Sequence, residues 1–207
     1  MDKLRPDLAV IADAIRAGSR VLDIGCGDGA LLAVLREQKG VDARGMEIDP
    51  ALVELCVAQG LSVVQGDANR DLADYPDGAF DYTVLSQTLQ TAERPDLMLH
   101  ELLRVGRQAF VSFPNFAHWR MRAALMWGGR MPVTRALPVS WYETQNIHHV
   151  TVSDFRDLAL EKGAIIEREW FFADGRQSGS IGANWRSEFA VFLLARDRVA
   201  AGSSNAR

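Results

Sequence analysis

Residues 21–29 read VLDIGCGDG, and this stretch decides the fold. A short hydrophobic run ends beside an acid, Asp23, and glycines follow at every second position: Gly25, Gly27 and Gly29. Without a Cβ atom, glycine tolerates positive φ and lets a ligand approach the main chain closely. Glycines between a strand and a helix are one way to place a ligand at the carboxyl end of a parallel strand. We therefore expect a nucleotide-like ligand against this loop.

The regions around this loop alternate between short apolar strands and helices of about ten residues. Such alternation indicates parallel β-α-β units, and hence a doubly wound, three-layer α/β sandwich. The expected strands cover residues 20–24, 43–48, 62–65, 80–86 and 108–113. The expected helices cover residues 7–17, 30–38, 50–59 and 96–105.

Residues 114–150 break this rhythm and are too long for a simple connection. We interpret them as a cap inserted into a single domain of residues 1–196, with a helix at 117–127. The rhythm then resumes with Ser153 as the expected N-cap of a helix over 154–162. Strands at 164–172 and 188–195 follow, and the small polar tail 197–207 is expected to be disordered.

Composition narrows the class of protein. The chain has 207 residues, 48% of them hydrophobic and 24% charged, which is ordinary for one globular domain. No apolar stretch approaches the roughly 20 residues of a membrane span. The opening MDKLRPDLAVIADAIR carries acids among its apolar residues, unlike a secretory signal, so we expect a cytoplasmic location and no membrane partner.

The charge is unevenly distributed. The net charge is −4, which argues against a nucleic-acid partner. From Leu102 to Tyr142 there is no Asp or Glu, and the six arginines of that stretch leave −10 for the rest of the chain. This basic stretch is either a solvated face or a surface that meets an anionic substrate or acidic partner.

Two further acids follow the next two expected strands. A carboxylate at Glu47 can accept hydrogen bonds from ribose hydroxyls. Asp67, with the amide of Ala68 beside it, can accept from an exocyclic adenine amine. Each acid alone is equally typical of a helix cap or a solvated loop. The glycine loop and both acids in this order favour an adenosine ligand.

This constellation resembles the class I S-adenosylmethionine-dependent methyltransferases. The resemblance implies a seven-stranded, mostly parallel sheet with the last strand antiparallel, and S-adenosylmethionine or S-adenosylhomocysteine as cofactor. It also implies that Asp23 positions the methionine end, that the glycine loop makes room for it, and that the site opens at the end of the fourth strand. The cofactor-binding residues expected on this basis are Asp23, Gly25, Cys26, Gly27, Gly29, Glu47, Ile48, Asp67, Ala68 and Ser86.

A narrower resemblance lies in the inserted segment. The phrases SFPNFAHWRMR, GRMPVTRALP and WYETQNIHHVTVSDF, with LRPDL and LDIGCGDG, look like the methionine-biosynthesis protein MetW family. That family usually carries proline where this chain has Gln145, which frees one backbone angle. The resemblance implies homoserine O-acyltransferase as a partner.

No residue pattern identifies a catalytic group, so the catalytic residues stay unknown and enzymatic activity stays open. The acceptor-pocket candidates are Gln87, Asn115, His118, Tyr142 and His148. His148 and His149 are adjacent on an extended segment and point to opposite sides, so we expect no metal site. Cys26 and Cys56 are interpreted as free thiols.

Three hypotheses follow. The first is a MetW-like protein that binds S-adenosylmethionine and supports homoserine O-acyltransferase. The second is a free-standing methyltransferase acting on a small-molecule acceptor. The third is a scaffold that has lost its ligand, and the presence of Asp23, Glu47 and Asp67 argues against it. The expected helix at 117–127, with Met126 and Trp127 near one face, is either a lid packed on the domain or a docking helix.

Overall fold

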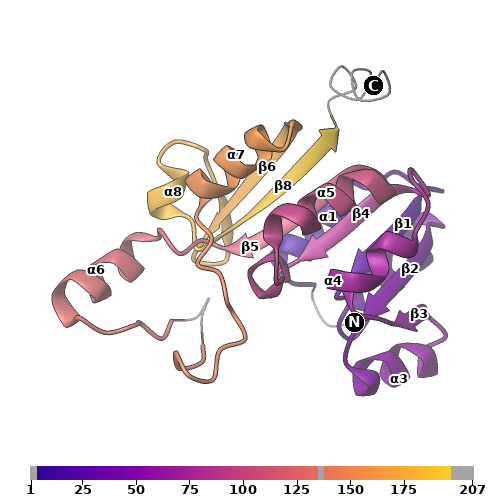
Figure 1. Cartoon of the computed structure of the whole chain (residues 1–207), viewed down its shortest axis with the longest axis horizontal. Coiled ribbons are helices and arrows are strands. Elements are labelled where there is room, and N and C mark those ends of the chain that lie inside the picture. The colour runs from indigo at the N-terminus through magenta and orange to yellow at the C-terminus, as the bar shows by residue number, and fades with distance from the viewer. Residues whose placement is uncertain (1–3, 135–137, 197–207) are drawn as a thin grey trace.

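The computed structural model describes residues 4–134 and 138–196. The expected disordered tail, 197–207, lies outside the described residues. One sheet runs through the molecule in the order β3-β2-β1-β4-β5-β8-β6-β7, with β1 to β5 parallel to one another (Figure 1). The strands are β1 (Arg20–Ile24), β2 (Asp42–Glu47), β3 (Ser62–Gln65), β4 (Phe80–Ser86), β5 (Gly106–Pro114), β6 (Ala164–Ala173), β7 (Arg176–Ser178) and β8 (Phe189–Arg196).

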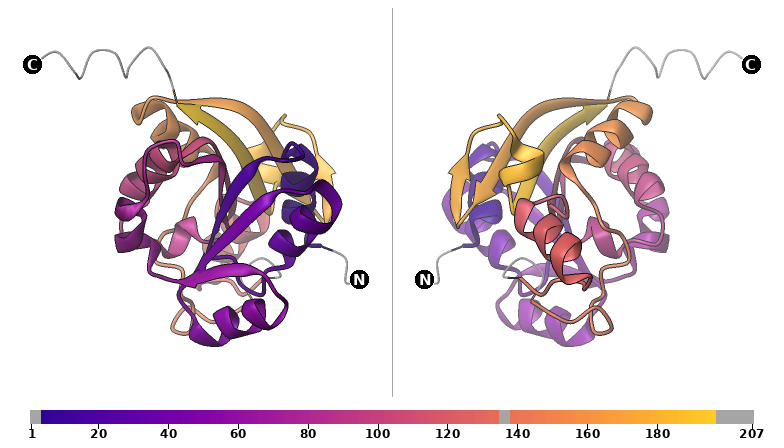
Figure 2. Two further views of the ribbon diagram at one scale, coloured as in Figure 1. Left: turned by 90° about the vertical axis from the view of Figure 1, so that its right-hand side faces the viewer. Right: turned by 90° about the vertical axis from the view of Figure 1, so that its left-hand side faces the viewer.

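Helices cover both faces of the sheet, so the expected doubly wound three-layer sandwich is confirmed (Figure 2). The α-helices are α1 (Pro6–Ala14), α2 (Ala30–Lys39), α3 (Pro50–Ala58), α4 (Ala68–Asp71), α5 (Pro95–Val105), α6 (Trp119–Gly128), α7 (Val152–Glu161) and α8 (Ala183–Arg186). Single 3-10 turns at Leu72–Asp74 and Leu89–Thr91 complete the elements.

The sheet has eight strands, which corrects the expectation of seven. The additional strand, β7, pairs antiparallel with β6 through a hairpin in which Ala173 faces Arg176. Asp174 and Gly175 form the turn, with φ of 48° and 72°. Positive φ at both central residues is typical of a tight hairpin, and Asp-Gly is a preferred pair there. The expected antiparallel strand is β8, which pairs antiparallel with β5 and β6.

Alternation along the strands supplies the two cores. Val21 packs in the cluster beneath α1 and α2 with Ile11, Leu31 and Phe110. Leu22 points the other way, into the cluster beneath α5 and α7. Successive strand residues face opposite sides of a sheet, which is why neighbouring residues of β1 serve different cores. This two-sided burial fixes the carboxyl ends of β1, β2 and β4 at one edge.

Local signals set most helix boundaries. The Asp49 side chain caps α3 by accepting a hydrogen bond from the Ala51 amide at 2.9 Å. The expected cap at Ser153 is wrong. Thr151 caps α7 instead, because its hydroxyl accepts from the amide of Asp154, and Ser153 lies inside the helix.

The insertion leaves the sheet at Pro114 and projects from the domain (Figure 1). Of the residues in α6, Met121 alone is buried. Met126 and Trp127 are 70% and 79% exposed, so α6 does not pack along the domain as a lid helix would. None of the described helices is long and apolar enough to cross a membrane.

Candidate functional site

A cleft of about 410 Å³ opens where the parallel strands end. Its walls come from the glycine loop, the ends of β2 and β3, the turns after β4 and the insertion. The lining residues are Gly25, Met46, Glu47, Ile48, Gly66, Asp67, Ala68, Asn69, Gln87, Thr88, Thr91, Ala92, Met98 and Gln145. Five of the expected cofactor-binding residues therefore share one wall: Gly25, Glu47, Ile48, Asp67 and Ala68. We call this space the adenosine cleft, after the ligand that the sequence predicts.

The glycine loop is held to β2 by its backbone. The amides of Gly25 and Cys26 both donate to the carbonyl of Met46, at 2.8 and 3.2 Å. Gly25 has φ of 69°, and a Cβ there would lie 2.8 Å from Oγ1 of Thr88. Gly27 has φ of 58° with no atom within 4 Å of its Cβ position, so the space beside it is open. The loop is the backbone cradle that a close-lying ligand requires.

Gly29 serves packing. A Cβ there would collide with the Leu61 side chain and approach Sγ of Cys56 to 2.9 Å. Gly29 also precedes α2 in the left-handed conformation, with φ of 78°. The third glycine is thus required by the contact between α2 and the Leu61 region, a role that the sequence pattern alone did not separate from ligand binding.

Glu47 joins two loops at the rim of the cleft. Its Oε2 accepts from the Gly27 amide at 2.8 Å, and its Oε1 accepts from the amides of Ile48 and Asp49 at 2.8 and 3.0 Å. A carboxylate has about four acceptor positions, so three are taken by the backbone. The side chain is 7% exposed and lines the cleft. It is therefore both a brace for the glycine loop and a candidate ribose acceptor.

Asp67 has the capping role that the sequence left open, and it also faces the cleft. Its side chain caps α4, since Oδ1 accepts from the amide and the side-chain nitrogen of Asn69 at 3.0 and 2.9 Å. It also lines the cleft. The Ala68 amide lies in the first turn of α4, where an N–H has no acceptor within the helix. A flat heterocycle against this turn would meet a donor and an acceptor side by side.

Asp23 has the most strongly shifted pKa among the acids expected to bind the ligand, although it is not among the residues that line the cleft. It is 2% exposed, and its Oδ1 is buried without a hydrogen-bond partner among the described residues. Burial raises the pKa of Asp23 to about 7; the nearby Arg5 opposes that rise, and the Glu47 and Asp7 carboxylates add to it. Leaving a buried carboxylate unpaired is costly. A cationic group of a ligand would remove that cost, so this orphaned atom fits a ligand that carries an ammonium group.

Cys26 and Cys56 are free and buried, as interpreted from the sequence. Burial raises the pKa of both thiols. Because the thiolate is the reactive form, neither cysteine is suited to act as a nucleophile at neutral pH. Cys56 instead donates from Sγ to the Gly27 carbonyl at 3.3 Å and steadies the loop.

Ser86 enters a buried network that the sequence did not reveal. Its hydroxyl donates to Oδ2 of Asp7 at 2.9 Å and accepts from Nη2 of Arg5 at 2.8 Å. Ser112 also donates to the same Asp7 oxygen, at 3.1 Å. Asp7 is 1% exposed. The network ties α1 to β4 and β5, and Ser86 is absent from the residues lining the adenosine cleft; its cofactor role stays a prediction.

Gln87 lies between two cavities. It is one of two non-glycine residues with positive φ in the described chain, at 52°. It lines the adenosine cleft and also a second cavity of about 460 Å³. The second cavity is lined by Arg5, Pro6, Asp7, Gln87, Pro114, Pro138, Asp174, Gly175, Glu188 and Phe189. Gln87 is thus the acceptor-pocket candidate that the structure places beside the adenosine cleft.

The other four acceptor-pocket candidates do not line the second cavity. Tyr142 is 71% exposed on the insertion. His118 precedes α6 and is 7% exposed, and burial lowers its pKa. His148 donates its amide to the Gln90 carbonyl at 3.0 Å, while its Nε2 is buried without a partner among the described residues.

Asn115 holds elements together. Its Nδ2 donates to the carbonyls of Asn184 and Ser187 at 3.1 and 2.8 Å. Its Oδ1 accepts from the amides of Ala117 and Val152 at 3.2 and 3.3 Å. With the side-chain amide fully engaged and 3% exposed, Asn115 is a structural junction.

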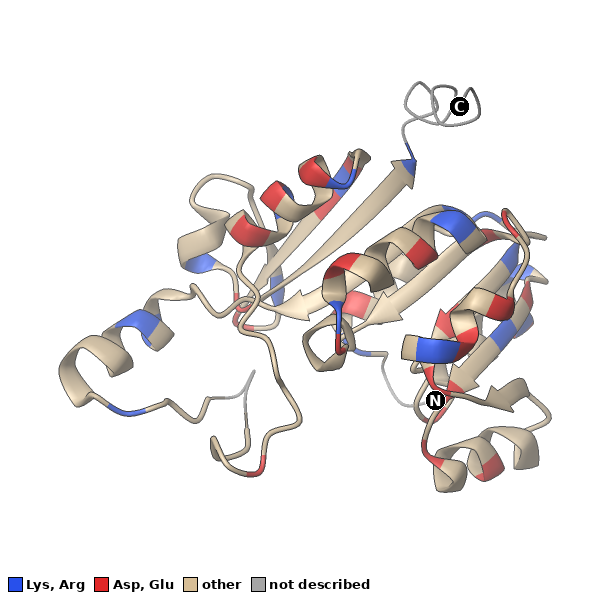
Figure 3. Cartoon of the chain, viewed as in Figure 1, with Lys and Arg blue, Asp and Glu red and all other residues tan. Residues whose placement is uncertain are grey.

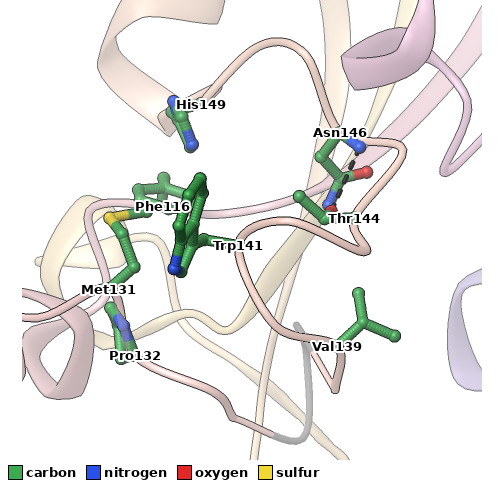
Figure 4. A pocket seen from close by; sticks show the side chains of 8 residues that line it. All are labelled: Phe116, Met131, Pro132, Val139, Trp141, Thr144, Asn146 and His149. Atoms are coloured by element: carbon green, nitrogen blue, oxygen red, sulfur yellow. Dashed lines mark hydrogen bonds between the residues drawn. The ribbon is translucent and has the colours of Figure 1, made fainter.

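The insertion has a pocket of its own, of about 260 Å³ (Figure 4). It is lined by Phe116, Met131, Pro132, Val139, Trp141, Thr144, Asn146 and His149, from both limbs of the insertion. We call it the cap pocket. Thr144 and Asn146 line it, whereas Gln145 between them lines the adenosine cleft. The segment 144–149 is therefore a wall shared by the two spaces, and we call it the strap.

No three His, Cys, Asp or Glu side chains gather into a possible metal site within residues 4–134 and 138–196. The site consists of a backbone cradle, two rim acids and a buried acid. These groups can hold an adenosine with a cationic tail. They form no paired acid and base that would mark a hydrolase.

Comparison with known proteins agrees with the geometry. A family described as "Methionine biosynthesis protein MetW" matches residues 5–194. The "Bifunctional methionine biosynthesis protein MetXA/MetW" of Rhodopirellula baltica is 35% identical over 178 residues, which cover 82% of this chain. The matched region spans 29% of that relative, so most of the relative has no counterpart in this chain.

Solved structures give the fold. A SAM-dependent methyltransferase from Archaeoglobus fulgidus superposes with a TM-score of 0.70 at 15% identity, covering 93% of this chain and 92% of that one. A TehB-like SAM-dependent methyltransferase from Corynebacterium glutamicum gives 0.63 at 20% identity, covering 94% and 89%. The chain thus has the class I methyltransferase fold. A fold alone leaves the reaction open, because one fold hosts many activities.

Proposed function

The chain belongs to the methionine biosynthesis protein MetW family, and from that membership we propose that it binds S-adenosylmethionine or S-adenosylhomocysteine and supports a homoserine O-acyltransferase. The observation that supports the ligand half is the adenosine cleft, which Gly25, Glu47 and Asp67 line; the Gly27 amide is tied to its rim by the hydrogen bond to Glu47.

The residues fit this ligand in three places. Glu47 and Asp67 supply acceptors for hydroxyl and amine groups at the rim. Gly25 lines the cleft without a side chain, and no atom lies within 4 Å of the Cβ position of Gly27. The unpartnered Oδ1 of Asp23 favours a cationic amino-acid end nearby. When bound, S-adenosylmethionine would supply a methyl group on a sulfonium, and this chain's residues would bind it and shield it from water.

The partner half rests on the family and on one relative. The bifunctional relative is named for MetXA and MetW together, and this chain matches 29% of its length. Two activities joined in one chain are held close at high effective concentration. We infer that the present chain reaches the same arrangement by association with a separate acyltransferase.

The test is an acyltransferase assay with purified proteins. Homoserine acylation by the acyltransferase of the same organism is measured alone, with this chain, and with this chain plus S-adenosylmethionine. We expect the chain to raise the acylation rate and to co-elute with the enzyme in gel filtration. An unchanged rate together with separate elution would contradict the partner half.

A second candidate function has one specific observation in its favour. The cavity of about 460 Å³ shares the lining residue Gln87 with the adenosine cleft, so it could hold a methyl acceptor beside the cofactor. A free-standing methyltransferase would turn over a small molecule there, and Asp67→Arg would abolish the turnover. Methyl transfer from radiolabelled S-adenosylmethionine to extracted small metabolites would favour this alternative.

A further inference from the structure

The insertion exposes an unusual amount of apolar surface. Six of its large apolar side chains, Met126, Trp127, Val133, Trp141, Tyr142 and Ile147, are 61–79% exposed. They come from α6 and from the chain that returns from it, and together we call them the cap surface. Surface apolar residues scattered singly need no explanation, but a group containing two tryptophans and a tyrosine is typical of a protein interface.

The cap surface lies in a basic region. No Asp or Glu occurs from Leu102 to Tyr142, and Figure 3 shows no acidic position on α6. Glu143, exposed between Tyr142 and Ile147, is the one acid within the cap surface, and its side chain accepts a hydrogen bond from the Ser140 hydroxyl. Arg120 lies near the acids of Asp174 and Glu188, at 3.7 and 3.6 Å. Arg122 donates to the Ala117 carbonyl at 2.6 Å and lies over the Trp185 ring. Arg130 is exposed beside the cap surface, and no acidic side chain of the described chain forms an ion pair with it.

The cap pocket is a cavity in the same insertion that a partner side chain could enter. Its volume, about 260 Å³, is below the roughly 300–1,000 Å³ of small-molecule sites, so it suits one inserted side chain. Phe116 and His149 meet edge to face, with ring centroids 4.2 Å apart, and Met131 and Trp141 add apolar walls. Binding energy at protein interfaces concentrates where an anchor fills such a pocket.

We propose that the cap surface is where the homoserine O-acyltransferase docks, with an apolar side chain of that enzyme in the cap pocket and acidic residues facing Arg130. This proposal rests on the proposed function, because it assigns a surface to the partner. Charge selects this occupant. Two copies of the same basic region would repel one another across a symmetric contact, whereas an acidic enzyme surface would be attracted.

The experiment compares binding of the intact chain and three variants to the purified acyltransferase by surface plasmon resonance. Trp127→Glu and Trp141→Glu change exposed residues of the cap surface, 79% and 72% exposed. Leu160→Glu is the matched control, since Leu160 is 77% exposed near the end of α7, outside the insertion. We expect each tryptophan variant to bind the acyltransferase at least about tenfold more weakly and the control to bind like the unaltered chain.

Titration with S-adenosylhomocysteine is run on every variant, and unchanged affinity there shows that each variant is folded. Unaltered affinity of both tryptophan variants for the acyltransferase would overturn the surface assignment while leaving the proposed function in place. If the unaltered chain itself fails to bind the acyltransferase, the proposed association with that enzyme is wrong, and the surface assignment that rests on it is wrong as well. The assignment would also be overturned if this chain formed a concentration-dependent dimer and either tryptophan substitution caused that dimer to dissociate. The cap surface would then bind a second copy of the chain.

Discussion

At Asp23, burial and charge act against each other. The carboxyl is buried within β1, its Oδ1 has no hydrogen-bond partner among the described residues, and burial raises its pKa to about 7. A site that keeps such a group gains when a ligand supplies the missing partner. Glu47 and Asp67 differ, because backbone amides already satisfy much of their hydrogen-bonding capacity. Among the three acids, Asp23 is therefore the one whose state depends most on the ligand.

Affinity for S-adenosylhomocysteine should therefore depend on pH through Asp23. With a pKa of about 7 in the free protein, the carboxyl is protonated below pH 7, and a cationic ligand group favours the ionised form. Affinity should fall as the pH drops from 7 to 5, by up to about tenfold per pH unit. Calorimetric titrations across this range check it. Asp23→Asn should bind more weakly with a flatter profile, and an equally steep profile in that variant would refute the assignment.

At the scale of elements, the insertion is attached at two places. Asn115 fastens its first limb by bonds to α8 and to the start of α7. The strap fastens its second limb, because the amides of Ile147 and His148 both donate to the Gln90 carbonyl, at 2.9 and 3.0 Å. Between these attachments α6 and its neighbours extend from the domain (Figure 1). The attachments differ in what they touch, since only the strap meets the adenosine cleft among the described parts of the insertion.

Asn115→Ala should lower the free energy of unfolding by about 2–5 kcal/mol, because it leaves two buried amides and two carbonyls without their partner. Urea denaturation measures the change. Affinity for S-adenosylhomocysteine should stay within about twofold, since Asn115 does not line the adenosine cleft. A large loss of affinity without a loss of stability would indicate instead that Asn115 contacts the ligand.

The strap should respond to the ligand. Gln145 lines the adenosine cleft, so a molecule that fills the cleft packs against the strap and slows its opening. Hydrogen exchange of the Ile147 and His148 amides should slow several-fold when S-adenosylhomocysteine is added. The Phe155 amide, bonded to the Thr151 carbonyl in α7, is the internal control and should not change. Unchanged hydrogen exchange of the strap amides at saturating ligand would show that ligand binding in the adenosine cleft does not affect the strap or the cap pocket.

At the scale of the whole molecule, charge is divided between two regions. The chain carries −4 overall, yet the stretch from Leu102 to Tyr142 contains six arginines and no acid. Parts of that stretch are neutralised locally: Arg104 pairs with Glu101 and Asp77 at 2.6 and 2.7 Å. Arg107 and Arg120 also lie near acids, at 3.8 Å from Asp81 and 3.6 Å from Glu188. Arg122 and Arg130, in and just after α6, carry the positive charge that has no acidic partner among the described residues (Figure 3). Ligand and partner would therefore meet regions of opposite charge.

Association with the acyltransferase should be sensitive to salt. If an acidic surface is drawn to the basic region, raising the salt concentration screens the attraction and slows encounter. The association rate constant should fall several-fold between about 50 and about 300 mM NaCl, over which the Debye length shortens by roughly half. The dissociation rate constant should change less. Stopped-flow mixing measures both rates. If salt leaves the association rate constant unchanged, charge does not determine which partner the cap surface binds.

Local patterns predicted the strands well and the distant contacts poorly. Strands β1 and β4 begin and end where the apolar runs do, because residues on both of their faces are buried. Strand β3 also has the expected bounds, although most of its residues are exposed. The hairpin at Asp174 and Gly175 could have been predicted, because Asp-Gly is a preferred pair in tight hairpin turns. The network of Arg5, Asp7, Ser86 and Ser112 had none, since its members are brought together only by the fold. For the same reason Asn115 and Ser86 looked available for a ligand, whereas tertiary partners occupy them.

The measurement that tests the account most directly is a calorimetric titration of the full chain with S-adenosylmethionine and S-adenosylhomocysteine, beside two valine variants. Gly27→Val and Gly18→Val both place a side chain at positive φ, 58° and 70°, with no atom within 4 Å of the new Cβ. Both should lose similar stability, but Gly27 borders the cradle and Gly18 lies at the other end of β1. We expect the unaltered chain to bind both ligands in the micromolar range, Gly27→Val to lose this binding and Gly18→Val to keep it. Absence of binding by the unaltered chain, or full affinity in Gly27→Val, would contradict it.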